Sequence, residues 1–262
     1  SGMVELSMAD VAGGGFAGGA ALAGRRPMYI IRYQGFNWFN APIIVNYACK
    51  SKEIWGVSCP LFIRSIAMEG GIGPVAGSSH HSIYYRMPGI RIRSPMTPGE
   101  YQRCYEDFMK SDEVFYISEH RGAYSNEEEL MDLSPDDAMV CLFPISITRF
   151  AAVKAAKKLK SKGISVAVYH IESIKPLSLP DVAKLNLRKT SLGLVLDDDY
   201  SSGVAKSIAF DLIQETGARI ETLGLADKTA GFHKAVDNLP PDEHDIEEKV
   251  LNIIDKNGVK IG

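Results

Sequence analysis

The chain has 262 residues, of which 45% are hydrophobic and 23% are charged, and its 24 glycines and 13 prolines are spread along it. These values describe a globular protein of one large or two medium domains, and they exclude a collagen, a disulfide miniprotein and a disordered tail. The formal net charge of −3 provides no basic surface for a phosphate backbone, so we expect no nucleic-acid partner.

The four cysteines are far apart, and none forms a CxxC pair or stands near a histidine at the spacing of metal ligands. We therefore expect reduced thiols and no metal site in this chain. No stretch reaches the roughly 20 apolar residues that span a bilayer, and the N-terminus lacks the features of a signal peptide, so we expect a cytoplasmic protein without membrane contact. The cysteines are Cys49, Cys59, Cys104 and Cys141.

Small residues dominate the segment between Asp10 and Arg25, which is poor in side-chain volume and helix-like from Phe16 onward. A helix this bare can approach another backbone closely, and the residues leave open whether that neighbour is a second helix or a cofactor. A nucleotide-binding loop is disfavoured, because no GxGxxG motif follows a strand and no GxxxxGK[ST] motif occurs.

Four apolar runs that suit buried parallel strands come next, with helix-compatible stretches between them. This alternation is typical of β/α units around a parallel sheet. The runs are Met28–Tyr33, Pro60–Ile66, Ile90–Ser94 and Val114–Ser118.

An acidic, turn-rich stretch over residues 125–137 reads as a linker, and the strand and helix alternation restarts after it. The sequence thus predicts an α/β protein of two three-layer domains with mostly parallel sheets, over residues 1–124 and 138–262. In the second domain we expect the strands Ala138–Phe143, Ile164–His170, Leu192–Leu196 and Arg219–Leu223, and the helices Ile147–Ser161 and Gly203–Thr216.

Four segments, taken in their order and spacing, resemble a known family. The segment Met8–Pro27 matches the pattern E-x-G-F-A-G-x-A-x-G-A-A-M-A-G-x-R-P of the transketolase-like thiamine diphosphate enzymes, and the nearest resemblance is to the beta subunit of 2-oxo acid dehydrogenase decarboxylating components. The resemblance implies a pyrimidine-binding domain over residues 1–124 and a transketolase C-terminal domain over residues 138–262. The other matching segments are Tyr33–Phe36, Met87–Pro98 and Ile174–Leu177.

The resemblance implies that Asp10, Val11, Gly35 and Phe36 contact the pyrimidine half of thiamine diphosphate. Asp10 stands where the family has a glutamate that hydrogen-bonds a pyrimidine nitrogen, which makes Asp10 a catalytic candidate although its side chain is one methylene shorter. Phe36 matches the aromatic residue that stacks on the pyrimidine. The residues alone leave two alternatives open, which are Asp10 as the N-cap of the following helix and Phe36 as ordinary core packing.

Two histidines follow a glycine-rich loop. The segment Glu69–Ser82 resembles the family loop whose histidine faces the substrate, so His80 and His81 are the remaining catalytic candidates, with His81 favoured. Both stand closer to the next strand than the family histidine, whose place falls near residues 75–77, and the alternative is a histidine pair beside the site mouth. We expect His120, which follows another strand, in a solvated loop.

The motif GDGxxxxN, through which the family holds the cofactor's diphosphate and metal, is absent from the sequence, and Asp197, Asp198 and Asp199 stand where the family has a glutamate pair. The resemblance therefore implies that an alpha-type partner with that motif binds the diphosphate and Mg²⁺, in an α2β2 heterotetramer with a contact between beta subunits. Family members also have a helix and a strand ahead of the segment Val4–Asp10, which we expect upstream of the given residues or in a partner.

Three functions remain open at this stage. The first is a thiamine diphosphate enzyme subunit that, with its partner, decarboxylates a 2-oxo acid or transfers a two-carbon unit. The second is the C-terminal subunit of a split transketolase that acts on sugars. The third, suggested by Asp10 and the displaced histidines, is a non-catalytic scaffold.

Overall fold

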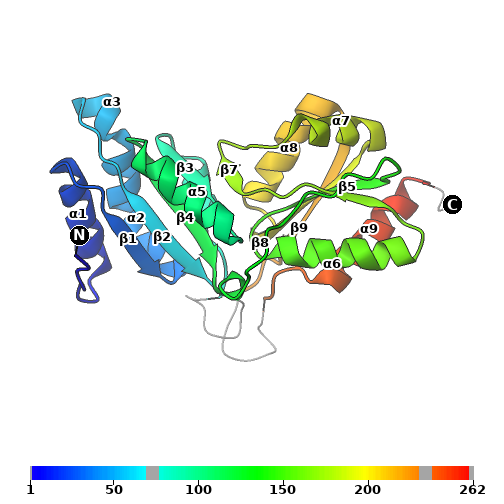
Figure 1. Cartoon of the computed structure of the whole chain (residues 1–262), viewed down its shortest axis with the longest axis horizontal. Helices are drawn as coiled ribbons and strands as arrows, with labels where there is room; N and C mark the ends of the chain where they lie inside the picture. The colour runs from blue at the N-terminus through cyan, green and yellow to red at the C-terminus, as the bar shows by residue number, and fades with distance from the viewer. Residues whose placement is uncertain (1, 69–76, 230–237, 260–262) are drawn as a thin grey trace.

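The computed structural model describes residues 2–68, 77–229 and 238–259. Its two α/β halves lie side by side along the long axis, each built on one sheet (Figure 1). Every strand expected from the sequence is present, although the expected strand Ile164–His170 shortens to Val166–Val168. The first half contains α1 Asp10–Leu22, β1 Met28–Arg32, α2 Asn37–Asn46, α3 Ser51–Trp55, β2 Phe62–Ala67, α4 Ser82–Tyr85, β3 Ile90–Arg93, α5 Pro98–Met109 and β4 Val114–His120.

The second half follows the segment 125–137, which forms no helix or strand. All four strands of its sheet are parallel, in the order β6-β5-β8-β9. The elements are β5 Val140–Pro144, α6 Thr148–Ser161, β6 Val166–Val168, β7 Ser173–Lys175, α7 Asp181–Thr190, β8 Leu192–Tyr200, α8 Val204–Thr216, β9 Arg219–Leu225 and α9 Glu243–Lys256.

Helices cover both faces of each sheet, which confirms the expected three layers. In the second half, α7 and α8 lie above the sheet and α6 and α9 below it (Figure 1). The alternation along β5 explains this, because Cys141 and Phe143 join one apolar cluster with α7 and α8 while Val140 and Leu142 join another with α6 and α9. In the first half, α5 packs on one face through Phe108, and α1 and α2 cover the other.

The sheet of the first half has the order β1-β2-β4-β3-β7 and contains one element that the sequence did not predict. The short strand β7 lies beyond the segment 125–137 but pairs antiparallel with β3. Its residues Ser173–Lys175 are too few and too polar to give a strand pattern. A strand from the second half therefore completes the sheet of the first, so the two halves share backbone hydrogen bonds.

The small-residue segment is helical from Asp10, six residues earlier than expected. Asp10 is not the N-cap: Ala9 holds that position, and no side chain caps the helix. The alternative role of Asp10 as an N-cap is therefore contradicted. As the first helical residue, Asp10 places its charge where the helix dipole favours an anion.

Candidate functional site

Asp10 and Phe36 lie at the amino ends of two neighbouring helices. Short connections join α1 and α2 to opposite ends of β1, so both helices run antiparallel to β1 and parallel to each other. They touch where Gly14 faces Asn40, since a Cβ on Gly14 would lie 2.6 Å from Asn40 Oδ1. Asp10 is one turn before Gly14 and Phe36 one turn before Asn40, so the helix contact brings the carboxyl and the aromatic ring to the same edge of the domain.

This edge is open to solvent. Asp10, Gly35 and Phe36 are partly buried, and Val11 is 56% exposed. Several large apolar side chains of the same helices are also more than half exposed, which is unusual for residues of this size without a partner. These exposed residues are Phe16, Trp38 and Phe39.

Helix α1, which consists mostly of small residues, packs against α2 on one face and is exposed on the other. Gly14 and Gly18 both face α2: a Cβ on Gly14 would collide with Asn40 Oδ1, whereas a Cβ on Gly18 would make an ordinary contact with Ile43 at 3.6 Å. Gly15 and Gly19 have no atom within 4 Å of their would-be Cβ positions. The helix–helix alternative is therefore confirmed for the inner face, while the outer face is free for a ligand or another chain.

Gln34, which sequence reasoning missed, holds the turn that carries Gly35 and Phe36. Its side chain is fully buried, and Nε2 donates to Ser65 O, Ser118 Oγ and Glu119 O at the ends of β2 and β4. Its Oε1 accepts the backbone N–H of His80 at 2.6 Å. The side-chain amide of Gln34 thus connects the turn that carries Phe36, the ends of β2 and β4, and the segment that contains His80. The sequence offered no signal for this role, because it shows only a single glutamine at the end of a strand.

His80 lies beside this turn with a half-buried ring. Its Nε2 is 3.0 Å from Ser78 Oγ, and the ring centroid is 6.4 Å from that of Tyr200. Burial lowers the pKa of His80, an effect that Asp199 opposes and His81 reinforces. A neutral imidazole at neutral pH can accept a proton, which suits an acid–base role. The loop residues 69–76 ahead of this segment lie outside the described residues.

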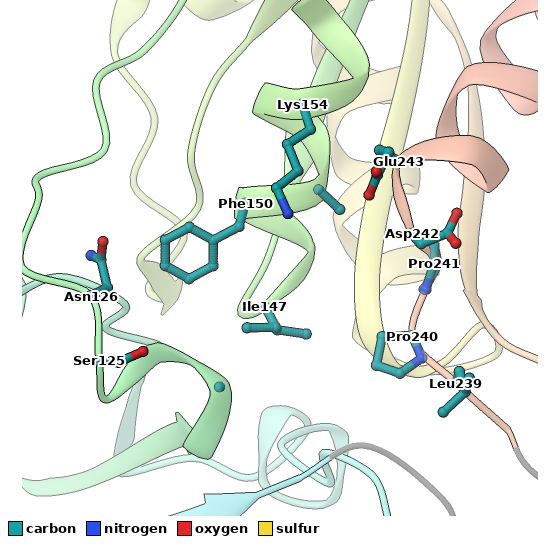
Figure 2. Close-up of a pocket in the computed structure, with 12 residues that line it drawn as sticks. Ser125, Asn126, Ile147, Phe150, Lys154, Leu239, Pro240, Pro241, Asp242 and Glu243 are labelled. Carbon is teal, nitrogen blue, oxygen red and sulfur yellow. The ribbon is translucent and has the colours of Figure 1, made fainter. Parts of the chain in front are cut away.

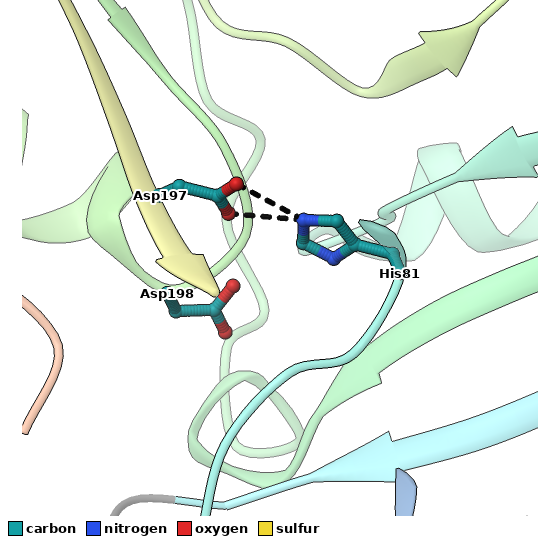
Figure 3. Close-up of side chains that lie close together, drawn as sticks. All are labelled: His81, Asp197 and Asp198. Carbon is teal, nitrogen blue, oxygen red and sulfur yellow. Dashed lines mark hydrogen bonds and ion pairs between the residues drawn. The ribbon is translucent and has the colours of Figure 1, made fainter. Parts of the chain in front are cut away.

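His81 is fully buried between the two halves of the chain (Figure 3). Its Nδ1 lies 3.0 Å from Ser118 Oγ, and its Nε2 lies 3.0 Å from Asp197 Oδ1. Burial by itself lowers the pKa of His81, but the charges of the three neighbouring aspartates and the hydrogen bond to Asp197 outweigh it and raise the pKa to about 10. Both ring nitrogens are used inside the protein, so this position favours a structural role, and substrate contact by His81 stays a prediction.

Asp198 extends the same buried cluster. Its Oδ2 accepts hydrogen bonds from Ser79 Oγ and Ser146 Oγ, both at 2.7 Å, while burial raises its pKa. His120 was expected in a solvated loop, and that prediction is wrong, because the side chain is 1% exposed and Nε2 lies 4.0 Å from Asp198 Oδ2. Strand β4 continues to residue 120, so the ring belongs to the strand and faces Asp198 of the second half instead of solvent.

A separate cavity of about 540 Å³ lies between α6, the turn at Ser125 and the segment before α9 (Figure 2). Phe150 and Ile147 line one side, and Pro240 and Pro241 face them. None of the candidate residues from the sequence lines this cavity. The candidate site therefore remains the open edge with Asp10, Phe36 and His80.

The residues at that edge fit the pyrimidine half of thiamine diphosphate. A partly exposed carboxyl at a helix amino end can hydrogen-bond a ring nitrogen, and the half-buried ring of Phe36 offers an apolar face for stacking. The bare outer face beside Gly15 lets a flat group approach the backbone. No GDGxxxxN segment occurs in the sequence, so the fit concerns one half of the cofactor.

Two family models match the chain, namely the transketolase pyrimidine-binding domain over residues 3–127 and the transketolase C-terminal domain over residues 132–243. The pyruvate dehydrogenase E1 component subunit beta of Rhizobium meliloti (strain 1021) is 25% identical over 224 residues, which cover 77% of this chain and 48% of that protein. The 2-oxoisovalerate dehydrogenase subunit beta of Bacillus subtilis (strain 168) is 24% identical, with 79% of this chain and 68% of that protein covered. This chain thus spans about half the length of the first relative.

The fold also matches a solved structure, described as a split gene transketolase in an inactive beta4 tetramer. The TM-score is 0.74 at 16% identity, and the match covers 96% of this chain and 83% of that one. None of the described helices is both long and apolar enough to cross a bilayer. The two domain matches, in the order of the two halves, show that the chain belongs to the transketolase-like family of thiamine diphosphate enzymes.

Proposed function

We propose that the chain is the pyrimidine-binding, beta-type subunit of a thiamine diphosphate enzyme that cleaves a carbon–carbon bond next to a carbonyl. Its substrate is a small 2-oxo acid or a ketose. An alpha-type subunit with a GDGxxxxN motif supplies the diphosphate and Mg²⁺ site, the assembly is an α2β2 heterotetramer, and its location is the cytoplasm. The observation that carries the proposal is the placement of Asp10 and Phe36 at the amino ends of two packed helices on an exposed edge.

Each residue at this edge has a distinct task in the proposal. Thiamine diphosphate, when bound, would supply a nucleophilic carbon that adds to the substrate carbonyl and a cationic ring that takes up the electron pair of the cleaved bond. The Asp10 carboxyl hydrogen-bonds the pyrimidine nitrogen, with Val11 beside it, and Phe36 stacks on the ring with the Gly35 backbone at its border. The His80 imidazole exchanges a proton with the substrate. Gln34 holds the turn and the His80 backbone in register.

The exposed apolar side chains beside the site support a partner chain. Phe16, Trp38 and Phe39 are each more than half exposed on α1 and α2, and burying aromatic side chains dominates the energy of many interfaces. A site with only one wall excludes water poorly, and a second chain over this edge closes it. We expect the chain alone to lack turnover.

Reconstitution tests the proposal. The chain is combined with an alpha-type subunit that carries GDGxxxxN, with Mg²⁺ and thiamine diphosphate, and two quantities are measured: hydrogen–deuterium exchange at the thiazolium carbon and turnover of 2-oxo acids and ketose phosphates. We expect both exchange and turnover. Asp10→Asn is expected to lower the exchange rate at least about a hundredfold, because it removes the carboxyl that assists proton transfer. Asp211→Asn, an exposed residue of α8, is the matched control.

The outcomes separate the alternatives. Turnover of ketose phosphates without turnover of 2-oxo acids establishes a split transketolase. Exchange and turnover that are unchanged in Asp10→Asn show that the carboxyl assignment is wrong. The absence of both in the complete assembly establishes a non-catalytic scaffold.

A further inference from the structure

We propose that His81, Asp197 and Asp198 bind a divalent first-row metal ion that joins the two halves of the chain. The site lies entirely within this chain and is separate from the Mg²⁺ that the partner is proposed to hold. One ligand comes from the segment before α4 in the first half, and two come from β8 in the second half (Figure 3).

The potential ligand atoms of the three residues already lie close together. One potential ligand atom from each residue lies within 4.8 Å of the other two, and all three residues are buried. Ligands about 2.0–2.2 Å from a central ion stand about 3–4 Å apart, so only small side-chain rotations are needed to converge on one ion. His81 and Asp197 are 116 positions apart, which explains why no ligand spacing was visible in the sequence.

An unpartnered oxygen points to the ion. Asp198 is 1% exposed, and its Oδ2 accepts two serine hydroxyls, yet its Oδ1 has no hydrogen-bond partner among the described residues. A buried carboxylate oxygen without a partner is costly, and a cation satisfies it. His120 does not supply the missing hydrogen bond, because its Nδ1 accepts the Gly122 N–H and its Nε2, which also has no hydrogen-bond partner among the described residues, lies 4.0 Å from Asp198 Oδ2, beyond hydrogen-bond distance.

The charge balance of the cluster points the same way. Asp197, Asp198 and Asp199 are each at most 3% exposed, and among the described residues no lysine or arginine lies within ion-pair distance of them. Burying three carboxylates with only the proton shared by His81 and Asp197 to offset their charges is unfavourable. A divalent ion compensates two of these charges, and it takes the place of the proton that His81 Nε2 shares with Asp197, which is released to solvent.

The types of ligand atom indicate which class of ion the site prefers. One imidazole nitrogen and two carboxylates suit Zn²⁺ or Mn²⁺ better than Ca²⁺, which prefers oxygen ligands alone. The other ring nitrogen, Nδ1, lies 3.0 Å from Ser118 Oγ, an outer partner of the kind that orients metal-binding histidines. Asp199 is outside the set of ligand atoms that lie within 4.8 Å of one another, and both of its oxygens accept backbone N–H groups, from Ser82 and Tyr200.

The test uses the full chain after EDTA treatment, without thiamine diphosphate. Calorimetric titration with Zn²⁺ and with Mn²⁺ is expected to show one bound ion per chain for at least one of them, and the melting temperature is expected to rise on binding. Asp198→Asn, which keeps the shape of the side chain, is expected to weaken the affinity at least about tenfold. Asp211→Asn is expected to bind as the wild type does.

Two results overturn the proposal, and neither depends on a variant that folds poorly. The first is a wild-type chain that binds neither ion. The second is a wild-type chain in which Co²⁺, used as a spectroscopic probe, gives the same visible spectrum with and without His81→Gln, since the nitrogen ligand is then not His81. Loss of cofactor-dependent turnover with metal binding intact contradicts the proposed function alone.

Discussion

Arg149 of α6 and Glu100 of α5 form a buried ion pair across the contact between the two halves. Nη1 of Arg149 donates to Oε2 of Glu100 at 2.8 Å, and Nη2 donates to Oε1 at 2.5 Å. The side chains are 1% and 6% exposed. Since the two residues are 49 positions apart and belong to different domains, no sequence pattern indicated the pair.

Removing one member of this pair is expected to destabilise the chain strongly. Glu100→Ala leaves a buried guanidinium without its counter-ion, and we expect a loss of on the order of 3–5 kcal/mol in the free energy of unfolding, measured by urea denaturation. The double variant Glu100→Leu, Arg149→Met buries no charge and should recover much of the loss. Glu113→Ala, at the half-exposed pair with Arg91, should cost under about 1 kcal/mol. Equal losses for Glu100→Ala and Glu113→Ala would contradict the argument.

Stability is expected to fall in mild acid because of His170. Burial, reinforced by the charge of Arg149, lowers the pKa of His170 from 6.5 to about 4 in the folded chain. Between these two pH values the unfolded chain binds more protons than the folded chain, so the free energy of unfolding increases with pH. The contribution of His170 to stability is complete above about pH 6.5 and is lost as the pH falls from about 6.5 to about 4. The contribution is on the order of 3 kcal/mol.

Chemical denaturation at a series of pH values measures this effect. His170→Gln should flatten the slope between pH 4 and pH 6.5, while His244→Gln, an exposed position on α9, should leave it unchanged. A wild-type slope that persists in His170→Gln assigns the acid sensitivity to another group.

The sequence predicted those parts of the fold that depend on local patterns. Apolar runs such as Val114–Ser118 became strands, because a parallel strand covered on both faces needs a continuous apolar run. The strand β7 escaped prediction because three residues carry no period, and its partner β3 lies in the other half. The burial of His81 and His120 depends on how the halves meet, which no local pattern contains.

In the candidate site, too, the sequence predicted single residues but not the contacts between them. Asp10 and Phe36 could be found by resemblance, but their proximity follows from the contact of Gly14 with Asn40, a detail of helix packing. Gln34 has four hydrogen bonds to four separate residues, and a single glutamine in a sequence gives no sign of such partners.

Gln34 is expected to matter for both stability and activity. Gln34→Leu leaves Ser65 O and the His80 N–H without their partner inside the protein, and we expect a loss of about 2 kcal/mol or more in the free energy of unfolding. In the reconstituted complex, kcat/KM should fall because the turn with Phe36 is no longer hydrogen-bonded to the backbone of His80. Gln102→Leu, an exposed glutamine of α5, should change stability by less than about 0.5 kcal/mol. Wild-type stability in Gln34→Leu would show that the network is not formed.

Alanine at two glycines of α1 should have opposite effects. At Gly14 the new Cβ would lie 2.6 Å from Asn40 Oδ1, so either the buried Asn40 side chain or the two helices must shift, and we expect a loss of about 1–3 kcal/mol in the free energy of unfolding. At Gly19 no atom lies within 4 Å, so alanine should only restrict the unfolded chain and stabilise by about 0.5–1 kcal/mol. Thermal and urea unfolding measure both. Because Asp10 and Phe36 owe their proximity to this helix contact, Gly14→Ala should also weaken cofactor-dependent turnover of the reconstituted complex, and Gly19→Ala should not. Stabilisation by Gly14→Ala would show that the helices are not packed as closely as the argument requires, and the placement of the two site residues would then lose its support.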